Sequence, residues 1–515
     1  MIDCAKTNLL KDLRSGFQIF LLALPLSLGI ARASGYPPAM GILTAMIGGM
    51  VTSLFRVTPL AIKGPAAGLI TVAAAAIADF GGIDSAWGTI SAIVLLVGVA
   101  QILFGIFKLG SISEYFPETV VHGMLAAIGL IIILKHIPIL LGVDPALYKN
   151  LSPVELFVSI PVFIENIQMQ VAIIGFLSLG LLIIYPFITI KSIRRLPAPI
   201  WILTASIGLA IYWQMKTNAL TYELVHIGNF WDSINIRPDF TAVKQGLFWK
   251  YFIMFLFVST IESLLTVKAL ESIDPKKREV NPDGDLIGQG AGNMFSGLLG
   301  GLPMISEVVR STSNASFGAQ SKWANFFHGF FMLLVMLLFI PVIEWIPNAS
   351  LAALLLFAGY NLASLKHFIH VYKIGKEQFV IFLVTIFFTL YEDLLVGVAA
   401  GMLIKAAIEM HYGLTFKNLF RAAYTLEKSA TSLTIRMKEA AIFTHRNAIK
   451  NLLESNKEFP HLIIDLSAVK IIDHSFMVML DSLKKNKYGD RLTIIGFENF
   501  RALSEHSLST KVSTG

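Results

Sequence analysis

The sequence predicts an all-α polytopic membrane domain followed by a small cytosolic α/β domain. Of the 515 residues, 55% are hydrophobic and only 15% are charged, with a mean hydropathy of +0.69, whereas soluble chains are about a quarter charged. Long apolar segments recur as far as residue 412, and beyond Gly413 the apolar runs become short and alternate with polar helical patterns. We therefore predict a transmembrane domain over 1–412, a linker over 413–430 and a soluble domain over 431–515.

The membrane domain divides into about fourteen apolar elements. A helix needs about 20 apolar residues to cross a bilayer, and several of the elements are too short to cross fully. The predicted elements are 15–33, 39–55, 65–78, 88–107, 119–135, 171–189, 198–214, 247–270, 285–300, 305–317, 323–343, 350–362, 379–391 and 393–412.

Basic residues in the loops predict the orientation. The N-terminal segment, the loops at Arg56 and Lys108, and the clusters at 191–195 and 276–278 alternate with long loops that are sparser in Lys and Arg. Cytoplasmic loops carry the excess of positive charge. The sequence thus predicts an integral protein of a bacterial-type plasma (inner) membrane, with the N-terminus and the soluble domain in the cytosol.

An internal repeat is predicted from three pairs of similar positions in the same order. The pairs are Trp87 with Trp323, Pro65 with Pro303, and Glu114 with Glu344, at separations of 236, 238 and 230 positions. Such nearly constant offsets indicate a duplicated unit of about seven elements. Since seven is odd, the second copy enters the membrane from the opposite side, which gives a 7+7 inverted repeat.

The soluble domain shows its own pattern. Residues 462–466 and 492–496 have the short apolar runs of buried strands, and 445–456 and 475–486 have helical patterns.

Two short segments in matching positions of the repeat predict an anion site. Each opens with a proline, which is tolerated at the first position of a helix, and a helix that begins inside a bilayer offers free N–H groups and a positive dipole end to an anion. The alternative is that these segments are kinks or small residues for helix packing. The residues expected at the anion are Lys63, Gly64, Ala66, Ala67 and Gly68 in the first half, and Ser306, Val308, Val309 and Arg310 in the second. For Lys63 a place in a cytosol-facing loop is the competing interpretation.

Glu262 lies in an otherwise apolar segment, and an acid there is costly enough to suggest function. With Thr266 one helical turn away it predicts a site that couples Na⁺ or H⁺ to the movement of the anion. The alternative is a structural pair of Glu262 with Lys268 or Arg310. Glu307 is expected either to add a second protonation site or to neutralise Arg310.

Other classes of function are not supported by the sequence. The single Cys4 excludes an intramolecular disulfide framework, and no zinc-protease, serine-hydrolase or phosphate-loop motif occurs. The net charge of +7 arises from residues in short loops rather than from a nucleic-acid-binding patch. We therefore expect no enzyme activity, no organic cofactor, no metal beyond Na⁺ at Glu262, and no nucleic-acid partner.

Several motifs together resemble the SulP family of inorganic anion transporters. They are Glu262-Ser263-Leu264-Leu265-Thr266, Gln289-Gly290-Ala291-Gly292-Asn293, Gly300-Gly301-Leu302-Pro303, Arg310-Ser311, Asn314, Gly35-Tyr36-Pro37-Pro38-Ala39-Met40-Gly41 and Gly64-Pro65. The segments Ile463-Ile464-Asp465-Leu466-Ser467 and Ile472-Asp473-His474-Ser475 are similar to the STAS domain of such transporters.

The resemblance implies fourteen elements in a seven-plus-seven repeat, split into a core and a gate with dimer contacts. It implies an anion site between the N-termini of the third and tenth helices, a coupling acid at Glu262, and a regulatory phosphorylation site at Ser475. The sequence departs from the family pattern at Leu24-Pro25-Leu26-Ser27, where a glutamine commonly follows the proline, and in the charges of Lys63 and Glu307.

The expected function is secondary active transport of a small inorganic anion, with bicarbonate favoured and sulfate next, coupled to Na⁺ or H⁺ by an elevator-like movement. The alternatives are an uncoupled anion channel, a dicarboxylate transporter, or a membrane scaffold that recruits a partner through the STAS domain. The expected partners are the anion, membrane lipid, a second copy in a homodimer and a cytosolic partner of the STAS domain.

Overall fold

The computed structural model describes every residue except 1, 149–150, 191–192, 194–195, 214–223, 228–229, 235, 277, 279, 393 and 515. The chain forms two compact units. One contains residues 1–110 and 128–362, and the other contains 111–127 and 363–515.

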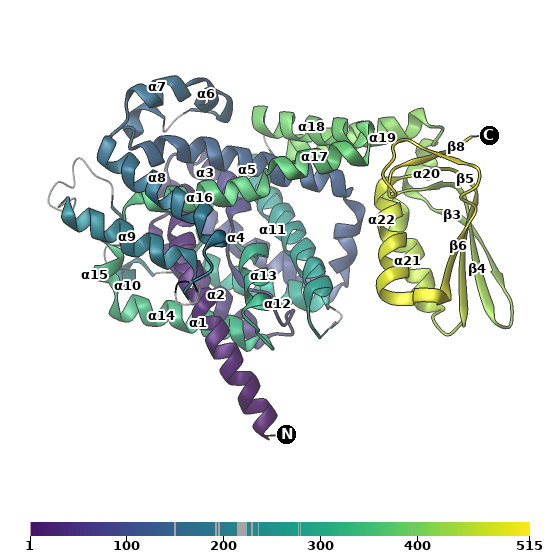
Figure 1. Ribbon diagram of the computed structural model, residues 1–515, viewed down its shortest axis with the longest axis horizontal. Coiled ribbons are helices and arrows are strands. Elements are labelled where there is room, and N and C mark those ends of the chain that lie inside the picture. The colour runs from purple at the N-terminus through teal and green to yellow at the C-terminus, as the bar shows by residue number, and fades with distance from the viewer. Residues whose placement is uncertain are drawn as a thin grey trace. The chain divides into compact units, whose positions relative to one another are not determined.

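The first unit is a helical bundle with one short pair of strands (Figure 1). Its helices are α1 (Ile2–Ala33), α2 (Pro38–Met50), α3 (Ile70–Asp79), α4 (Ile83–Ile106), most of α5 (Glu118–Leu141), α6 (Pro153–Val158), α7 (Ile160–Glu165), α8 (Met169–Ile184), α9 (Ala198–Tyr212), α10 (Phe230–Ser233), α11 (Gly246–Ile273), α12 (Pro282–Leu298), α13 (Val308–Ser316), α14 (Trp323–Leu338), α15 (Ile340–Ile343) and α16 (Asn348–Leu362). The strands are β1 (Lys63–Pro65) and β2 (Met304–Ser306).

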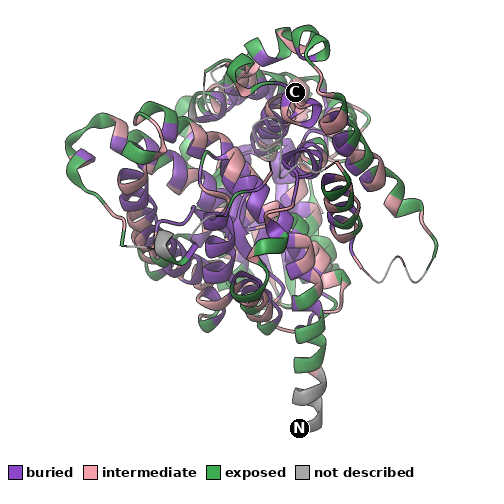
Figure 2. Cartoon of the chain, turned by 90° about the vertical axis from the view of Figure 1, so that its left-hand side faces the viewer, coloured by how far each residue is buried: buried purple, intermediate pink, exposed green. Residues whose placement is uncertain are grey.

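Small residues allow the central helices of this unit to touch. A Cβ added at Gly290 of α12 would lie 2.5 Å from the carbonyl oxygen of Gly98 in α4, so the two backbones are in direct contact. Glycine permits such an approach because it has no side chain. Buried residues accordingly gather along the middle of the bundle, while residues 9–14 of α1 are largely exposed (Figure 2).

Six helical stretches in the described chain are long and apolar enough to cross a membrane, and shorter apolar helices accompany them. The six are Asn8–Ala33, Ile83–Ile106, Glu118–Leu141, Met169–Phe187, Gly246–Lys268 and Asn348–Ile374. All fourteen predicted elements coincide with helical segments, but which of them cross the membrane stays a prediction. Of the basic clusters that predicted the orientation, residues 191, 192, 194, 195 and 277 lie outside the described residues.

The chain between the predicted elements at 119–135 and 171–189 is partly helical. Helix α5 continues to Leu141, and α6 and α7 follow. Ser152 begins α6 with a capping box, in which its hydroxyl accepts from the backbone N–H of Glu155 and the Glu155 carboxylate accepts from the N–H of Ser152. This local capping supports a helix that is too short to show an apolar period.

The second unit joins apolar helices to an α/β domain. Besides the first turns of α5, its elements are α17 (Leu365–Ile374), α18 (Lys376–Tyr391), α19 (Leu394–His411), α20 (Phe416–Phe420), β3 (Ala423–Lys428), β4 (Ser432–Ala441), α21 (Arg446–Ser455), β5 (His461–Ile472), α22 (His474–Leu483), β6 (Leu492–Ile495), β7 (Phe500–Ala502) and β8 (Lys511–Ser513). The sequence did not predict α17, whose residues mix histidine and lysine with apolar side chains.

The sheet of this unit has the order β3-β4-β5-β8-β7, and β6 also pairs with β5. Strands β4, β5 and β6 run parallel, and α21 and α22 connect them in βαβ units. The predicted strands at 462–466 and 492–496 correspond to β5 and β6, and the predicted helices to α21 and α22. The core between sheet and helices includes Leu433, Ile435, Leu462, Ile464, Phe476 and Leu480.

The predicted linker over 413–430 contains part of this sheet. Residues 423–428 form β3 and pair with β4 in antiparallel register, from Ala423 opposite Lys438 to Lys428 opposite Leu433. Helices α17, α18 and α19 belong to the same compact unit as the sheet, so the boundary between the two units does not fall at residue 412.

Candidate functional site

The two short segments singled out in the sequence lie side by side. Strands β1 and β2 pair antiparallel, with Lys63 opposite Ser306, Gly64 opposite Ile305 and Pro65 opposite Met304. Each strand leads into a short helix: α3 has 10 residues and α13 has 9. At 1.5 Å per residue these helices are about 15 Å long or less, which is about half the thickness of the hydrocarbon core.

The expectation that each proline starts a helix is wrong. Pro65 ends β1, and Pro303 precedes β2, because residues 304–306 are held extended by pairing with β1. Helix α13 begins only at Val308, where Glu307 serves as the N-cap and its Oε2 accepts from the backbone N–H of Arg310 at 2.8 Å. Helix α3 begins at Ile70, after a 3-10 turn over Ala67–Leu69.

Glu262 lies against the start of the first short helix. Its side chain projects from α11 and is 9% exposed, and a Cβ added at Gly68 would overlap its Oε2. Neither Oε2 of Glu262 nor the buried hydroxyl of Thr266 has a hydrogen-bond partner among the described residues. Only a glycine at position 68 leaves room for this carboxylate.

The structural pairs that were the alternative for Glu262 do not form. Among the described residues, Glu262 makes no ion pair with Lys268 or Arg310; the charged group that interacts with it is the Glu307 carboxylate. The two acids that we predicted to handle cations are therefore neighbours in the structure.

Lys63 is fully buried, and both predicted interpretations of it need correction. Its ammonium donates to Oδ2 of Asp285 in a short contact and to Oγ of Ser306 at 2.5 Å. Asp285 also accepts from the backbone N–H of Thr58 at 2.9 Å. Lys63 therefore neither faces the cytosol nor offers a free charge to an anion; it joins β1 to α12 and β2. The predicted Ser306 hydroxyl is engaged in the same cluster.

Arg310 is the second cation predicted at the site, and unlike Lys63 its side chain forms no hydrogen bond among the described residues. This side chain is fully buried, and none of its three guanidinium nitrogens has a hydrogen-bond partner among the described residues. Its Nε lies 3.9 Å from Oε2 of Glu307, and a Cβ added at Gly64 would lie 2.7 Å from its Nη1. A buried guanidinium without hydrogen bonds is expensive, and the nearby Glu307 carboxylate offsets its charge.

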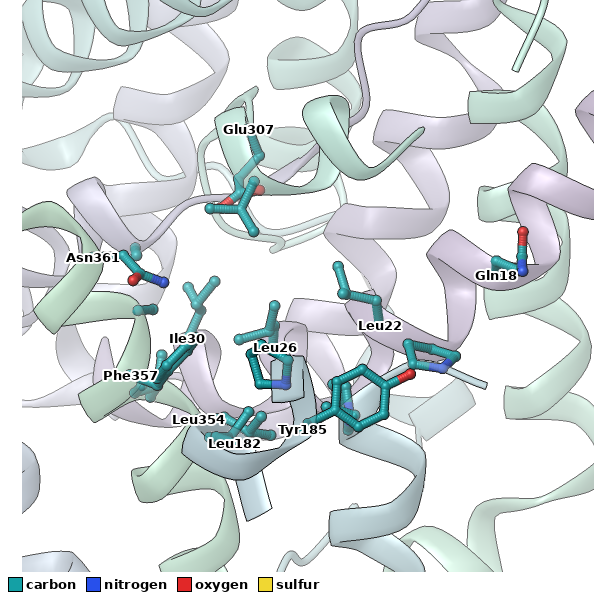
Figure 3. A pocket seen from close by; sticks show the side chains of 18 of the residues that line it. Gln18, Leu22, Leu26, Ile30, Leu182, Tyr185, Glu307, Leu354, Phe357 and Asn361 are labelled. Atoms are coloured by element: carbon teal, nitrogen blue, oxygen red, sulfur yellow. The ribbon is translucent and has the colours of Figure 1, made fainter. Parts of the chain in front are cut away.

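A cavity of about 290 Å³ opens beside the two helix starts. Helices α1, α8, α9 and α16 supply most of its wall, which is largely apolar, and Figure 3 shows Glu307 facing the row formed by Leu22, Leu26 and Ile30 of α1. Of the predicted anion residues, Ala67 and Val309 line this cavity. The other seven do not line it: Lys63, Gly64, Ala66, Gly68, Ser306, Val308 and Arg310.

Glu307 is the one ionisable carboxylate in the described lining, where Gln18, Tyr185 and Asn361 are the other strongly polar side chains. Gln18, Asn361 and Asp285 were not predicted from the sequence, although a polar amide in an apolar helix is a usable signal. His328, interpreted from the sequence as an isolated structural histidine, is buried in α14, and its ring nitrogens have no hydrogen-bond partner among the described residues.

Ser475 lies in the first turn of α22 and is fully buried. Asp473 caps this helix by accepting from the N–H of Phe476 at 2.7 Å, and it pairs with the Lys405 ammonium of α19 at 2.8 Å. Phosphorylation of Ser475 would therefore require that α22 first become accessible.

The bundle of apolar helices, together with the paired strands β1 and β2 that precede the short helices α3 and α13, is the architecture of an integral membrane protein. The chain belongs to the sulfate permease family, whose family model matches residues 9–385. It is 25% identical to the putative sulfate transporter YvdB of Bacillus subtilis, over 95% of this chain and 92% of the relative. It is 26% identical to the bicarbonate transporter BicA of Picosynechococcus, over 77% of this chain and 69% of the relative.

Solved structures show the same fold at low sequence identity. The transmembrane domain of a cyanobacterial BicA matches with a TM-score of 0.65 and 22% identity, over 77% of this chain and 97% of that one. The structure of SLC26A9 matches with a TM-score of 0.67 and 15% identity, over 95% of this chain and 84% of that one.

Proposed function

We propose that this protein is a secondary active transporter of a small inorganic anion that enters together with Na⁺ or H⁺. Bicarbonate is the favoured substrate and sulfate the next. The relatives are named as transporters of sulfate and bicarbonate, which supports transport rather than catalysis. The observation that carries the coupling is the balance of buried charges around the two helix starts.

Those charges leave one carboxylate without a compensating cation. Lys63 is paired with Asp285, and Arg310 lies 3.9 Å from Glu307. Glu262 has no cationic partner among the described residues. With every group ionised, the site therefore carries a net charge of −1 before any anion enters.

An anion added to this set would meet uncompensated negative charge. At about 5 Å and an effective dielectric constant of about 20, each pair of like charges costs about 3 kcal/mol. A proton or Na⁺ at Glu262 removes that cost, and the free Thr266 hydroxyl one turn away provides a second oxygen ligand for Na⁺. Anion affinity is thereby linked to cation binding, which is the requirement for symport.

The same balance favours a monovalent anion. Arg310 is the one cation at the site without a hydrogen bond among the described residues, and the cavity itself presents the Glu307 carboxylate. A single negative charge can be stabilised by Arg310 and the two helix N-termini, whereas a second charge would face Glu307. The charges of Arg310 and Glu307 therefore favour bicarbonate over sulfate as the substrate.

The apolar cavity wall favours a second candidate, transport of a dicarboxylate, because leucine and phenylalanine side chains would contact the carbon chain of an organic anion. An uncoupled channel and a scaffold that recruits a partner are outcomes that the experiment below separates.

The repeat, the identity of the α/β domain and the oligomeric state are part of the same proposal. The starts of α3 and α13 are 238 positions apart, which equals the offset of the two prolines and supports an inverted repeat of seven plus seven elements. We infer that the α/β domain is a cytosolic STAS domain, that the transporter is a homodimer in the lipid of an inner membrane, and that a core carrying the site moves against a gate.

The test is uptake into proteoliposomes loaded with the purified full-length protein. Labelled bicarbonate, sulfate, chloride and fumarate are each offered with and without an inward gradient of Na⁺ or H⁺. Gradient-dependent uptake of bicarbonate that is lost in Glu262→Gln and kept in the exposed control Glu165→Gln supports the proposal. Uptake that is equal with and without every gradient would establish a channel, and no flux of any anion would favour the scaffold.

A further inference from the structure

Four histidines line a second cavity, and all the residues of its described lining belong to the second unit. Its volume is about 370 Å³, and it is lined by His122 of α5, His370 of α17, His474 of α22 and His506 from the segment between β7 and β8. In the described part of the chain, no group of three or more His, Cys, Asp or Glu residues is arranged to hold a metal ion. The function of these imidazoles must therefore be sought in their protonation.

Two of the imidazoles form hydrogen bonds with the backbone of Leu508, one as a donor and the other as an acceptor. The carbonyl of Leu508 lies 2.7 Å from Nδ1 of His474, and because a carbonyl only accepts, this Nδ1 carries a proton. The N–H of Leu508 donates to Nδ1 of His506 at 3.2 Å, so that Nδ1 must be unprotonated. Protonation of His506 would place a hydrogen on its Nδ1 and break this bond, whereas His474 can take a proton on Nε2 and keep its bond.

The segment around Leu508 also attaches the α/β domain to the apolar helices. Ser504 donates its hydroxyl to the carbonyl of Ile374 in α17 at 2.6 Å. Gln378 of α18 donates to the hydroxyl of Thr510 at 3.2 Å. Loss of the Leu508 hydrogen bond would therefore loosen the part of the chain that makes these contacts.

Positive charge in this cavity would find little compensation. The rings of His370 and His506 are 5.9 Å apart, and those of His122 and His367 are 6.3 Å apart. Glu118 is the acid in the described lining, and it already lies 3.7 Å from Arg446. Two further cations are close, since Lys373 acts on His370 and Lys405 acts on His474.

His474 and His506 respond differently to acid. Burial lowers the pKa of this imidazole, and the nearby Asp473 opposes that effect while Lys405 and His506 add to it. A second proton on His474 is therefore disfavoured, and if it binds at Nε2 it leaves the bond to Leu508 intact. Acid should open the contact through Nδ1 of His506, because a proton there displaces the N–H of Leu508.

We propose that the histidine cavity is a proton-sensitive latch, in which protonation of His506 and the imidazoles beside it releases the 504–510 segment from α17 and α18. A fall in cytosolic pH would thereby loosen the attachment of the α/β domain to these apolar helices. The histidine cavity shares no lining residue with the cavity at Glu307. A test of the latch is therefore independent of the proposed substrate.

The experiment measures the contact in the full-length protein in lipid nanodiscs. With Cys4 replaced by serine, spin labels are attached at Lys366→Cys in α17 and Glu498→Cys in the α/β domain, both exposed positions. Between about pH 7.5 and about pH 5.5, the range in which histidine titrates, the distance distribution should broaden reversibly toward longer values. An identical distribution at both pH values would overturn the proposal.

Substitutions then assign the response to the cavity. In His506→Gln the distribution should no longer depend on pH, and the exposed control His461→Gln should respond like the wild type. A His506→Gln protein that still opens in acid would refute the latch. If this variant is open at both pH values, the hydrogen bond to Leu508 is confirmed as the holding contact. His370→Gln then decides the proton dependence: it should shift the opening midpoint to lower pH, and an unchanged midpoint would refute the latch.

Discussion

Replacing Asp285 by asparagine would leave the Lys63 ammonium buried without a counter-ion. The side chains of Lys63 and Asp285 are 0% and 1% exposed, so neither charge can be solvated in place. Breaking a buried pair by removing one partner costs about 3–5 kcal/mol. The amide oxygen of the new asparagine can still accept from the N–H of Thr58, as the carboxylate of Asp285 does at 2.9 Å, so the loss reports the charge rather than this hydrogen bond.

The magnitude can be measured as the free energy of unfolding by steric trapping in bicelles. We expect Asp285→Asn to lose about 3–5 kcal/mol, and the double variant with Lys63→Met to lose less than Asp285→Asn alone, because it contains no unpaired buried charge. The exposed control Asp84→Asn should be neutral within about 0.5 kcal/mol. A loss below about 1 kcal/mol for Asp285→Asn, or a double variant that loses the sum of both single losses, would refute the reasoning.

Two further predictions concern the transport site. Gly68→Ala places a Cβ against Oε2 of Glu262, too close for the two atoms to coexist without a shift. Because overpacking costs about 1–3 kcal/mol, we expect cation-dependent uptake into proteoliposomes to fall about tenfold or more. Gly180→Ala, which meets nothing within 4 Å, is the matched control, and equal loss in both variants would contradict the assignment. Glu307→Gln should raise the uptake of sulfate relative to bicarbonate about a hundredfold, because the second charge of sulfate no longer meets about 3 kcal/mol of repulsion. An unchanged ratio would show that Glu307 does not select charge.

The sequence predicted those features that leave a local or a repeated signal. Apolar length identified the long helices, and the offset of 238 positions between Pro65 and Pro303 identified the two segments that pair as β1 and β2. The acid in α11 was recognisable because ionisable groups are rare in apolar helices. Helix α17 was missed because its histidines and lysines dilute the apolar pattern.

The start of α13 and the partner of Lys63 depend on contacts between distant residues. Residues 304–306 are extended only because β1 lies beside them, so the helix is delayed to the next residue that can cap it, Glu307. Lys63 and Asp285 are 222 positions apart, and no local pattern connects them. Lys63 was predicted to contact the anion because its actual partner, Asp285, is brought close only by tertiary packing.

Glu262 and Glu307 differ in what they can contact, and under the proposed symport we expect this difference to set the order of the two binding events. Glu307 lines the cavity and is the first charge that an entering anion would meet, whereas Glu262 lies behind Gly68 and does not line the cavity. Arg310 is also recessed, beneath Gly64. An anion that enters before a cation would face Glu307 while Glu262 is still charged, so binding is favoured when the cation has reached Glu262 first. Under the proposed symport we therefore expect cation binding to precede anion binding, because Glu262 is buried behind Gly68 and Glu307 lines the cavity.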